Sequence, residues 1–456
     1  MRLLFAALLG LVTETAVQAA EAPARPNIVL VLCDDLGYGD LQCFGSPKIK
    51  TPNLDKFAGE GLKLTSCYAS APVCSPSRSG LLTGRTPNRA GIYDWIPDGS
   101  QMHLRKEEVT VAQILKDAGY ATCHIGKWHC NGRFNSPDQP QPGDQGFDYW
   151  MSTQNNAAPS HHNPINFVRN GKAAGKMEGY SSGLIVDEAL GWLHQLPADK
   201  PFCLFVWFHS PHEPIATAAE FTARYKDGTK PKEAEYYGNI AQMDAEFGRL
   251  IDTLDAMKLR DNTFVMFTSD NGPEYRAEHP FGSAGPLRGK KLHMYEGGIR
   301  VPGIVRYPGH TTAGQTSDEP INNTDFLPTF CALAGGKLPE RKLDGVNFLP
   351  ALEGKPLTRP VPLYWQYNAA LGGPKVALRE GDWKILADGA LKKFELYNLK
   401  TDIAESNDLA EKEPAKLKSL QEKLLALHAE VKAEGPVWKK KSPAEQKTSL
   451  EEIVDP

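Results

Sequence analysis

The stretch Ile28-Val29-Leu30-Val31-Leu32-Cys33, followed at once by Asp34-Asp35, decides the fold of this chain. An unbroken apolar run of this length is typical of a strand buried on both faces, as in a parallel sheet. Three later runs have the same character, at residues 121–125, 202–208 and 263–268. Helical patterns separate the runs at residues 110–118, 182–196 and 236–257. Strands that alternate with helices predict an α/β fold with a doubly wound, mostly parallel sheet.

Each of the four predicted strands ends in a polar cluster. Ligands of doubly wound sheets bind outside the carboxyl ends of the strands, so we expect these clusters to meet at one rim of the sheet. The rim would bring together acidic, basic and amide side chains that lie far apart along the chain. Its chemistry-bearing members are Asp34, Asp35, Lys127, His129, His212, Asp270 and Asn271.

The composition changes near residue 360, beyond which short aromatic-rich runs are separated by turn signals. Runs at residues 363–367, 376–379, 383–386 and 394–399 predict a smaller antiparallel sheet, and the leucine spacing of residues 416–431 predicts an amphipathic helix. A chain of 456 residues is too long for one simple core. We therefore predict a large α/β domain at residues 25–358 and a C-terminal α+β subdomain at residues 359–456, which ends in a polar tail.

The N-terminus has the layout of an export signal. Arg2 precedes an apolar run at residues 3–12, and small residues near Ala19 offer cleavage sites. This layout predicts a signal peptide over residues 1–20 and therefore an exported protein, periplasmic or secreted. The run is too short to cross a bilayer and no later stretch is long enough, so we expect no membrane span. A net charge of −4 gives no support for nucleic-acid binding.

The segment Cys74-Ser75-Pro76-Ser77-Arg78, followed by Leu81-Leu82-Thr83-Gly84-Arg85, carries a thiol at a predicted helix start. Proline suits a first helical turn, so Cys74 would lie at the positive end of the helix dipole, where an anion is stabilised. Arg78 would return to the same face one turn later. The string resembles the signature of the type I sulfatases, in which this cysteine is oxidised to formylglycine. The resemblance extends to about residue 399, and within the family the segments look closest to the arylsulfatase A and N-acetylgalactosamine-6-sulfatase groups.

The resemblance implies an alkaline-phosphatase-like fold, with residues 25–358 as the catalytic sulfatase domain. It also implies a divalent cation, and three carboxylates at one rim would repel one another without one. Hard oxygen ligands suit calcium or magnesium better than zinc, and calcium is favoured because its larger shell accepts several carboxylate oxygens. Conversion of the cysteine implies a formylglycine-generating enzyme as a partner during maturation. The implied metal ligands are Asp34, Asp35, Asp270, Asn271 and the converted Cys74.

Four basic residues, Lys127, His129, His212 and Lys291, fall at motif positions of the family and would face the substrate's anion. Spacing to the Glu-Gly-Gly segment at residues 296–298 selects Lys291 over its neighbour in the doubled lysine. The resemblance implies that His212, helped by Lys291, protonates the departing alcohol. His129 would take the proton whose loss expels sulfate.

The nucleophile implied by the resemblance is a hydroxyl of the hydrated aldehyde, which attacks sulfur in line. Asp270 would accept its proton, and Arg78 would hold the formylglycine in place. The implied reaction is the hydrolysis of sulfate monoesters, and an exported enzyme of this kind would act on sulfated carbohydrate.

Polar residues in a loop-like stretch offer candidates for substrate recognition: Gln154, His161 and His162, with His293 in the later lysine segment. Three aromatic residues could stack on a sugar ring or serve as core residues, and the sequence does not choose between the two: Trp95, Trp365 and Tyr367.

Two other functions remain open alternatives. A phosphate-ester hydrolase on the alkaline-phosphatase-like fold would need a serine or threonine nucleophile and usually two zinc ions, which Cys74 argues against. A non-catalytic protein that binds sulfated glycans would keep Cys74 as a thiol. The near-complete set of motifs favours the sulfatase.

Overall fold

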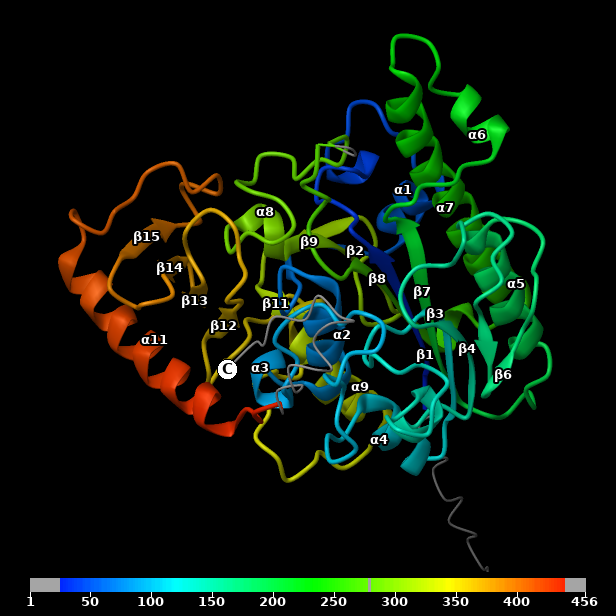
Figure 1. Cartoon of the computed structure of the whole chain (residues 1–456), viewed down its shortest axis with the longest axis horizontal. Coiled ribbons are helices and arrows are strands. Elements are labelled where there is room, and N and C mark those ends of the chain that lie inside the picture. The colour runs from blue at the N-terminus through cyan, green and yellow to red at the C-terminus, as the bar shows by residue number, and fades with distance from the viewer. Residues whose placement is uncertain (1–24, 278–279, 439–456) are drawn as a thin grey trace, which may run out of the picture.

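The computed structural model describes residues 25–277 and 280–438. Strand β1 (Asn27–Asp34) lies inside an eleven-stranded sheet, with β8 (Thr263–Ser269) on one side and β7 (Phe202–Pro211) on the other (Figure 1). Strand β3 (Ala121–Lys127) follows β7. The order β8-β1-β7-β3 is parallel throughout, so the four predicted strands are neighbours whose carboxyl ends share one edge.

The sheet is mixed rather than wholly parallel. Strand β9 (Arg300–Arg306) runs antiparallel to β8 and to β2 (Leu62–Tyr68), while β4 (Tyr149–Thr153) extends the parallel part beyond β3. The Pro302-Gly303 pair inside β9 disguises this strand in the sequence, because both residue types weaken a strand pattern. The short strands are β5 (Val168–Arg169), β6 (Lys172–Ala173), β10 (Gln315–Ser317) and β11 (Ile321–Asn322).

Alternate residues of β1 enter two separate cores, which makes the sheet doubly wound. Val29 and Val31 pack under helices on one face, and Leu30 and Leu32 pack under helices on the other. Both faces are therefore apolar, which explains the unbroken run in the sequence. The first face is covered by α1 (Pro52–Glu60), α5 (Ser181–Leu193) and α7 (Pro231–Ala256), and the second by α2 (Cys74–Thr83), α4 (Val111–Asp117) and α9 (Phe326–Ala334).

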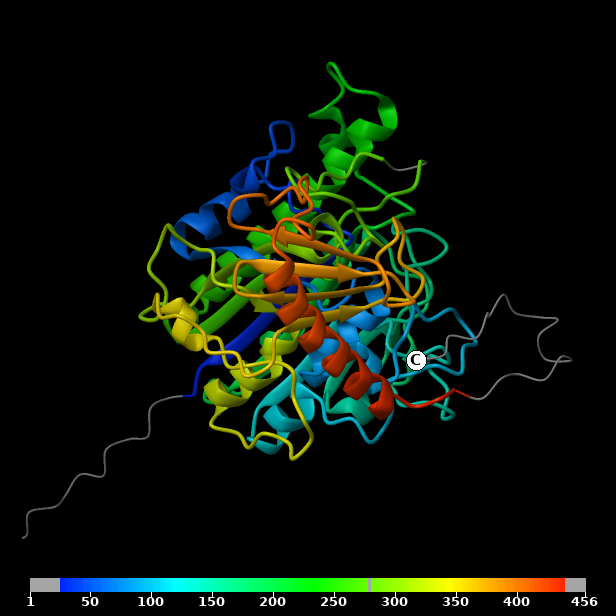
Figure 2. The ribbon, with the colours of Figure 1, turned by 90° about the vertical axis from the view of Figure 1, so that its left-hand side faces the viewer.

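The C-terminal region is a second, antiparallel sheet of four strands with α11 (Pro414–Glu434) lying across it (Figure 2). Trp365 and Ala377 face the large domain, whereas Tyr364 and Leu378 face α11. This alternation places the small sheet between α11 and the large sheet with its helices. Its strands are β12 (Leu363–Gln366), β13 (Val376–Glu380), β14 (Trp383–Ala387) and β15 (Phe394–Asn398).

These observations confirm the predicted fold class and its smaller C-terminal sheet with a helix. The predicted domain boundary after residue 358 falls between α10 and β12 and stays a prediction. The predicted signal peptide and the polar tail beyond residue 438 lie outside the described residues. No helix in residues 25–277 and 280–438 has the length and apolar character to cross a membrane. The remaining short helices are η1 (Gln42–Phe44), α3 (Pro87–Ala90), η2 (Pro142–Gln145), α6 (Ala219–Ala223), η3 (Arg260–Asn262), α8 (Glu296–Ile299), η4 (Asn323–Asp325) and α10 (Leu349–Leu352).

Candidate active site

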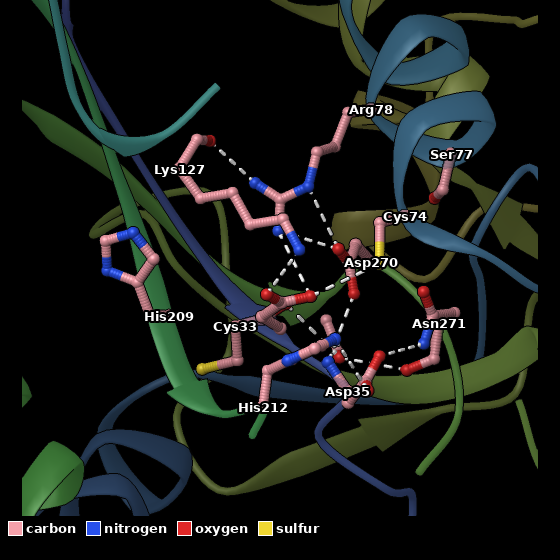
Figure 3. Close-up of polar contacts among 12 residues, drawn as sticks. Cys33, Asp35, Cys74, Ser77, Arg78, Lys127, His209, His212, Asp270 and Asn271 are labelled. Carbon is pink, nitrogen blue, oxygen red and sulfur yellow. Dashed lines mark hydrogen bonds and ion pairs between the residues drawn. The ribbon is translucent and has the colours of Figure 1, made fainter. Parts of the chain in front are cut away.

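The predicted rim exists, and polar side chains from four strand ends point into one pocket (Figure 3). Asp34 and Lys127 end β1 and β3, Asp270 and Asn271 follow β8, and His212 follows β7. Two further segments complete the pocket, the start of α2 and the loop before α8. We call this set of residues around Cys74 the rim pocket; it consists of Asp34, Asp35, Lys127, His212, Asp270 and Asn271 with the start of α2 and the loop before α8.

Cys74 is the first residue of α2 and only 3% exposed. Its Sγ lies 3.5 Å from Asp34 Oδ1, so the helix start delivers the sulfur to the end of β1. Burial raises the pKa of this thiol well above its ordinary value, although Lys127 and Lys291 act in the opposite direction. As encoded, the side chain is an un-ionised thiol and a poor nucleophile.

Arg78 is buried one turn further along α2 and ties three elements together. Its Nε and Nη2 donate to Asp270 Oδ2 at 3.0 and 2.6 Å, and its Nη1 donates to the Lys127 carbonyl at 2.8 Å. The guanidinium lies 5.1 Å from the ring centre of Trp207. The helix start is therefore held in a fixed position relative to β3 and β8.

Two lysines pair with the two carboxylates that follow each other at the end of β1. Lys127 Nζ donates to Asp34 Oδ2 at 2.7 Å, and Lys291 Nζ donates to Asp35 Oδ2 at 2.6 Å. Burial alone would raise the pKa of Asp34, but Lys127 and other nearby cations hold it well below its usual range. Burial raises the pKa of Asp35 to about 7, against the opposing effect of Lys291. The two carboxylates are therefore in different electrostatic environments.

The two predicted histidines present their rings in defined tautomers. His129 Nε2 donates to the Ile96 carbonyl at 3.1 Å, and its buried Nδ1 has no hydrogen-bond partner. His212 Nδ1 donates to the Glu213 carbonyl, which leaves Nε2 3.6 Å from Asp35 Oδ2. Burial lowers the pKa of both rings well below the ordinary value. Each ring is thus neutral and keeps one nitrogen free to accept a proton.

The residues fit a hard divalent cation. Asn271 Nδ2 donates to Asp35 Oδ1 at 2.7 Å, which fixes the amide so that its buried Oδ1 has no hydrogen-bond partner. Such an orphaned acceptor beside carboxylates calls for a cation or a donor. Ligand atoms of Asp34, Asp35, Cys74 and His212 also lie within 4.8 Å of one another. A hard cation takes the oxygens in preference to the imidazole of His212.

The rim pocket holds more carboxylates than cations. Its four carboxylates are those of Asp34, Asp35, Asp270 and Glu274, and its three cations are Arg78, Lys127 and Lys291. Glu274 belongs to the set because its Oε2 lies 3.7 Å from Lys291 Nζ. The histidines are neutral, so the side chains carry one surplus negative charge when all four carboxylates are ionised. Burial, which raises the pKa of Asp35 to about 7, lowers this surplus, and a bound cation would keep the carboxylates ionised. A bound divalent cation would turn the surplus into one positive charge, which matches an anion of charge −1.

The four predicted substrate-binding residues are in different settings. Gln154 Nε2 donates to the carbonyls of Ile96 and Asn131, so this amide group fastens loops together. His161 is buried with both ring nitrogens unpartnered, and burial lowers its pKa to about 4. His162 is exposed and stacks on a tyrosine, and His293 is half-buried beside the Lys290 carbonyl. Of these, His161 is close enough to the rim pocket for the charges of Asp34 and Lys127 to act on it.

Three groups of the pocket were not predicted from the sequence. Glu274 follows Asn271 by only three residues, so its proximity could have been noticed. The Ile96 carbonyl is a backbone group and carries no sequence signal. Trp207 reads as a plain core residue of β7, and only the contact with Arg78 reveals its supporting position.

A doubly wound sheet whose rim holds oxygen ligands, anion-binding lysines and a reactive position at a helix start defines an alkaline-phosphatase-like hydrolase of anionic esters. The family described as Sulfatase matches residues 26–336, and the one described as N-sulphoglucosamine sulphohydrolase, C-terminal, matches residues 289–432. The chain therefore belongs to the sulfatase family, whose members are sulfuric ester hydrolases.

Known relatives agree with this assignment. The human N-acetylgalactosamine-6-sulfatase is 34% identical over 76% of this chain and 69% of its own length. Human arylsulfatase A is 37% identical over 74% of this chain and 70% of its own length. Among solved structures, Ps i-CgsB in complex with a neocarrahexaose superimposes with a TM-score of 0.78 at 28% identity, covering 88% of this chain and 93% of the other.

Proposed function

We propose that this protein hydrolyses sulfate monoesters of carbohydrates through a formylglycine made from Cys74 and a bound calcium ion. The observation that carries the proposal is the rim pocket itself, where Cys74 heads a helix among oxygen ligands and anion-binding lysines. Its charge suits a sulfate monoester, which has a charge of −1, better than a phosphate monoester, which is a dianion near neutral pH.

The cation would be held by Asp34, Asp35, Asp270 and Asn271, together with the converted side chain at position 74. It would act as a Lewis acid that acidifies a hydroxyl and offsets charge on the sulfate oxygens. Calcium suits a site with several carboxylate oxygens, whereas magnesium prefers to keep its waters.

The proposal requires conversion of Cys74, since the encoded thiol is un-ionised. In addition, an intermediate with the sulfate group bound to this thiol would have no easy route for releasing sulfate. The hydrated aldehyde would supply the oxygen nucleophile. Cys74 is 3% exposed, so a formylglycine-generating enzyme would have to reach it before the chain folds. The signal peptide predicted at residues 1–20 fits this order, because export would take the converted chain to a periplasmic or secreted location.

The chain's own residues have separable tasks. Lys127 and Lys291 bind sulfate oxygens, which stabilises the charge that grows on them during transfer. Asp270 accepts the proton of the nucleophile, while its pairing with Arg78 keeps the helix start in position.

Proton transfer to the leaving group falls to His212. Its Nδ1 proton is committed to the Glu213 carbonyl, and Nε2 carries no proton in the neutral ring. His212 would therefore act as the acid after Nε2 has taken up a proton, which a bound sulfate anion favours, and that proton would pass to the departing alcohol oxygen, with Lys291 nearby. The unpartnered Nδ1 of His129 would take the proton whose loss releases sulfate.

The substrate class is a sulfated carbohydrate. The names of the N-acetylgalactosamine-6-sulfatase relative and of the neocarrahexaose complex support this class for the present chain. Gln154, His161, His162 and His293 remain proposed substrate contacts, with residues 25–358 as the catalytic domain and residues 359–456 as the C-terminal subdomain.

The proposal is tested by assaying matured protein on sulfated mono- and disaccharides and on the matching phosphate esters. We expect turnover of a sulfate ester, slower turnover of its phosphate counterpart, and an aldehyde in place of the thiol in the tryptic peptide at residues 64–78. Protein that carries the aldehyde and hydrolyses the phosphate esters faster would favour the phosphatase alternative. Protein that was produced together with the maturing enzyme, keeps the Cys74 thiol, and binds sulfated sugars without hydrolysing them would favour the binding protein.

A further inference from the structure

We propose that Trp95 is a sugar-stacking residue at the entrance of the rim pocket, on the side of His129. The inference rests on the proposed function, since it names the residue that recognises the carbohydrate half of the ester.

Trp95 differs from every other tryptophan of the chain in its exposure. Its side chain is 47% exposed, whereas the other seven are buried or half-buried. Trp365, which the sequence could not separate from it, is fully buried and donates from Nε1 to the Ala69 carbonyl at 2.7 Å. A single exposed apolar side chain is ordinary in itself, so the exposure of Trp95 matters through the place where its indole lies.

The position of the indole links it to the reaction. Its ring centre lies 6.5 Å from that of His129, with the planes inclined by 58°. His129 itself is 2% exposed, so the indole lies at the boundary between this buried ring and solvent. Ile96, the next residue, accepts the His129 Nε2 proton on its carbonyl.

The segment that carries the indole is held from three directions. Ile96 N donates to the hydroxyl of Ser75, the residue after Cys74, at 3.0 Å. Trp95 N donates to Asp94 Oδ1 at 2.7 Å, and the hydroxyl of Tyr367, from the C-terminal region, donates to the same oxygen at 2.7 Å. A platform fixed in this way loses little conformational entropy when it binds a ligand.

The chemistry of the indole selects the kind of group that covers it. One face of a pyranose ring presents C–H groups, which pack on a flat apolar ring, while its hydroxyls stay hydrated or bind polar neighbours. The sulfate would lie deep among the lysines, and the sugar that carries it would extend to the rim. Trp95 therefore favours a ring-shaped alcohol over a small flexible one.

A different role for Trp95 would be to shield His129 from water without touching substrate. The two roles differ in what they change. A shield acts on the chemistry of every substrate and on the environment of the sulfate, whereas a stacking platform acts on the binding of the sugar alone.

The experiment compares matured wild-type protein with Trp95→Ala, Trp95→Phe and the control Leu338→Ala. Leu338 is equally exposed, at 47%, and lies beside Arg25 and Ala118, away from the carboxyl rim. For each variant, kcat and KM are measured on a sulfated monosaccharide, and the inhibition constant of inorganic sulfate reports on the pocket alone. Thermal unfolding verifies that each variant folds.

We expect Trp95→Ala to raise KM for the sugar sulfate about tenfold, with kcat and the sulfate inhibition constant nearly unchanged. Trp95→Phe should recover most of the loss, and Leu338→Ala should behave as wild type. Equal KM values in wild type and Trp95→Ala, or a loss confined to kcat with altered sulfate inhibition, would overturn the inference. If matured wild-type protein cleaves no sulfate ester, the proposed function itself falls, which is a distinct result.

Discussion

Two of the buried charge clusters among the described residues differ in how their carboxylates are balanced by cations. The rim pocket surrounds Cys74, while a second cluster, which we call the inter-sheet cluster, joins the large sheet to the small one. In the latter, Lys384 Nζ donates to Glu296 Oε1 at 2.9 Å and lies 2.8 Å from Glu405 Oε1. Its members are Glu296, Arg300, Arg379, Lys384 and Glu405.

The balance of charges records the difference. Two carboxylates, Glu296 and Glu405, face three cations in the inter-sheet cluster, whereas four carboxylates face three cations in the rim pocket. Each cluster has one carboxyl group of lowered pKa and one of raised pKa. Burial alone would raise the pKa of Glu296, but Lys384 and Arg300 hold it at about 2. Burial raises the pKa of Asp35 in the rim pocket to about 7 even with Lys291 beside it, and the neighbouring Asn271 keeps an unpartnered oxygen. A cluster closed by cations of the protein stabilises the fold. A cluster with more carboxylates than cations, beside the unpartnered amide oxygen of Asn271, is suited to a cation that comes from outside the protein.

The largest expected effect is on the rim pocket. Cys74→Ala removes the proposed precursor of the nucleophile, so turnover of a sulfate ester should fall about 10⁴-fold or more, with little change in thermal stability. The control is Cys331→Ala, a buried cysteine of α9, which should keep turnover per folded molecule. Substantial turnover by Cys74→Ala would place the chemistry elsewhere.

His212→Ala should separate substrates by their leaving groups. A sugar alcohol is a poor leaving group and needs the proton, so kcat should fall about 10³-fold, whereas an aryl sulfate should lose much less. His310→Ala, at an exposed ring stacked on Tyr307, serves as the control. Full turnover of the sugar sulfate by His212→Ala would contradict the acid role.

The inter-sheet cluster should show its effect in stability instead. Lys384→Met leaves two buried carboxylates without their shared cation, which should lower the free energy of unfolding by about 3 kcal/mol. Lys423→Met breaks the exposed pair with Glu380 and should cost less than about 1 kcal/mol. Urea unfolding measures both, and equal losses in the two variants would refute the contrast between buried and exposed pairs.

The smallest expected effect is a pH dependence from Glu405. Burial raises its folded pKa to about 7 despite Lys384, above the ordinary value of 4.5, so the folded state binds this proton more tightly. Its contribution to stability is present below pH 4.5 and lost as pH rises through 7. Glu296, with a folded pKa of about 2, behaves oppositely and loses its contribution as pH falls through 2.

Glu405→Gln should therefore gain stability relative to wild type between pH 4.5 and 7, by about 2 kcal/mol. Denaturant unfolding at several pH values gives this difference directly. A difference between variant and wild type that stays constant over the interval would show that Glu405 does not titrate there.

The sequence predicted the parts of the molecule in which local pattern and tertiary position agree. Buried parallel strands need apolar residues on both faces, so β1 and β8 could be recognised, and their carboxyl ends had to carry Asp34 and Asp270 to one edge. Strand β9 was missed because Pro302 and Gly303 contradict a strand locally, while tertiary pairing with β2 and β8 overrides them.

Other features depend on three-dimensional contacts that leave no mark in the sequence. The tautomer of His129 is set by a backbone carbonyl, that of Ile96. Trp95 lies in a loop that faces solvent, whereas Trp365 lies in β12 and packs into a core, although both residues look alike in the chain. Asn271 Oδ1 can be recognised as unpartnered only when the hydrogen bonds of the Asn271 amide group are known.

The central claim is tested most directly by titrating metal-free protein with calcium and measuring the heat of binding. The titration is done on wild type and on Asn271→Ala. We predict that wild type binds one equivalent of calcium more tightly than zinc, and that Asn271→Ala binds it at least about tenfold more weakly. Equal calcium affinity in the two proteins, or a preference of wild type for zinc, would contradict an oxygen-lined cation site at the strand ends.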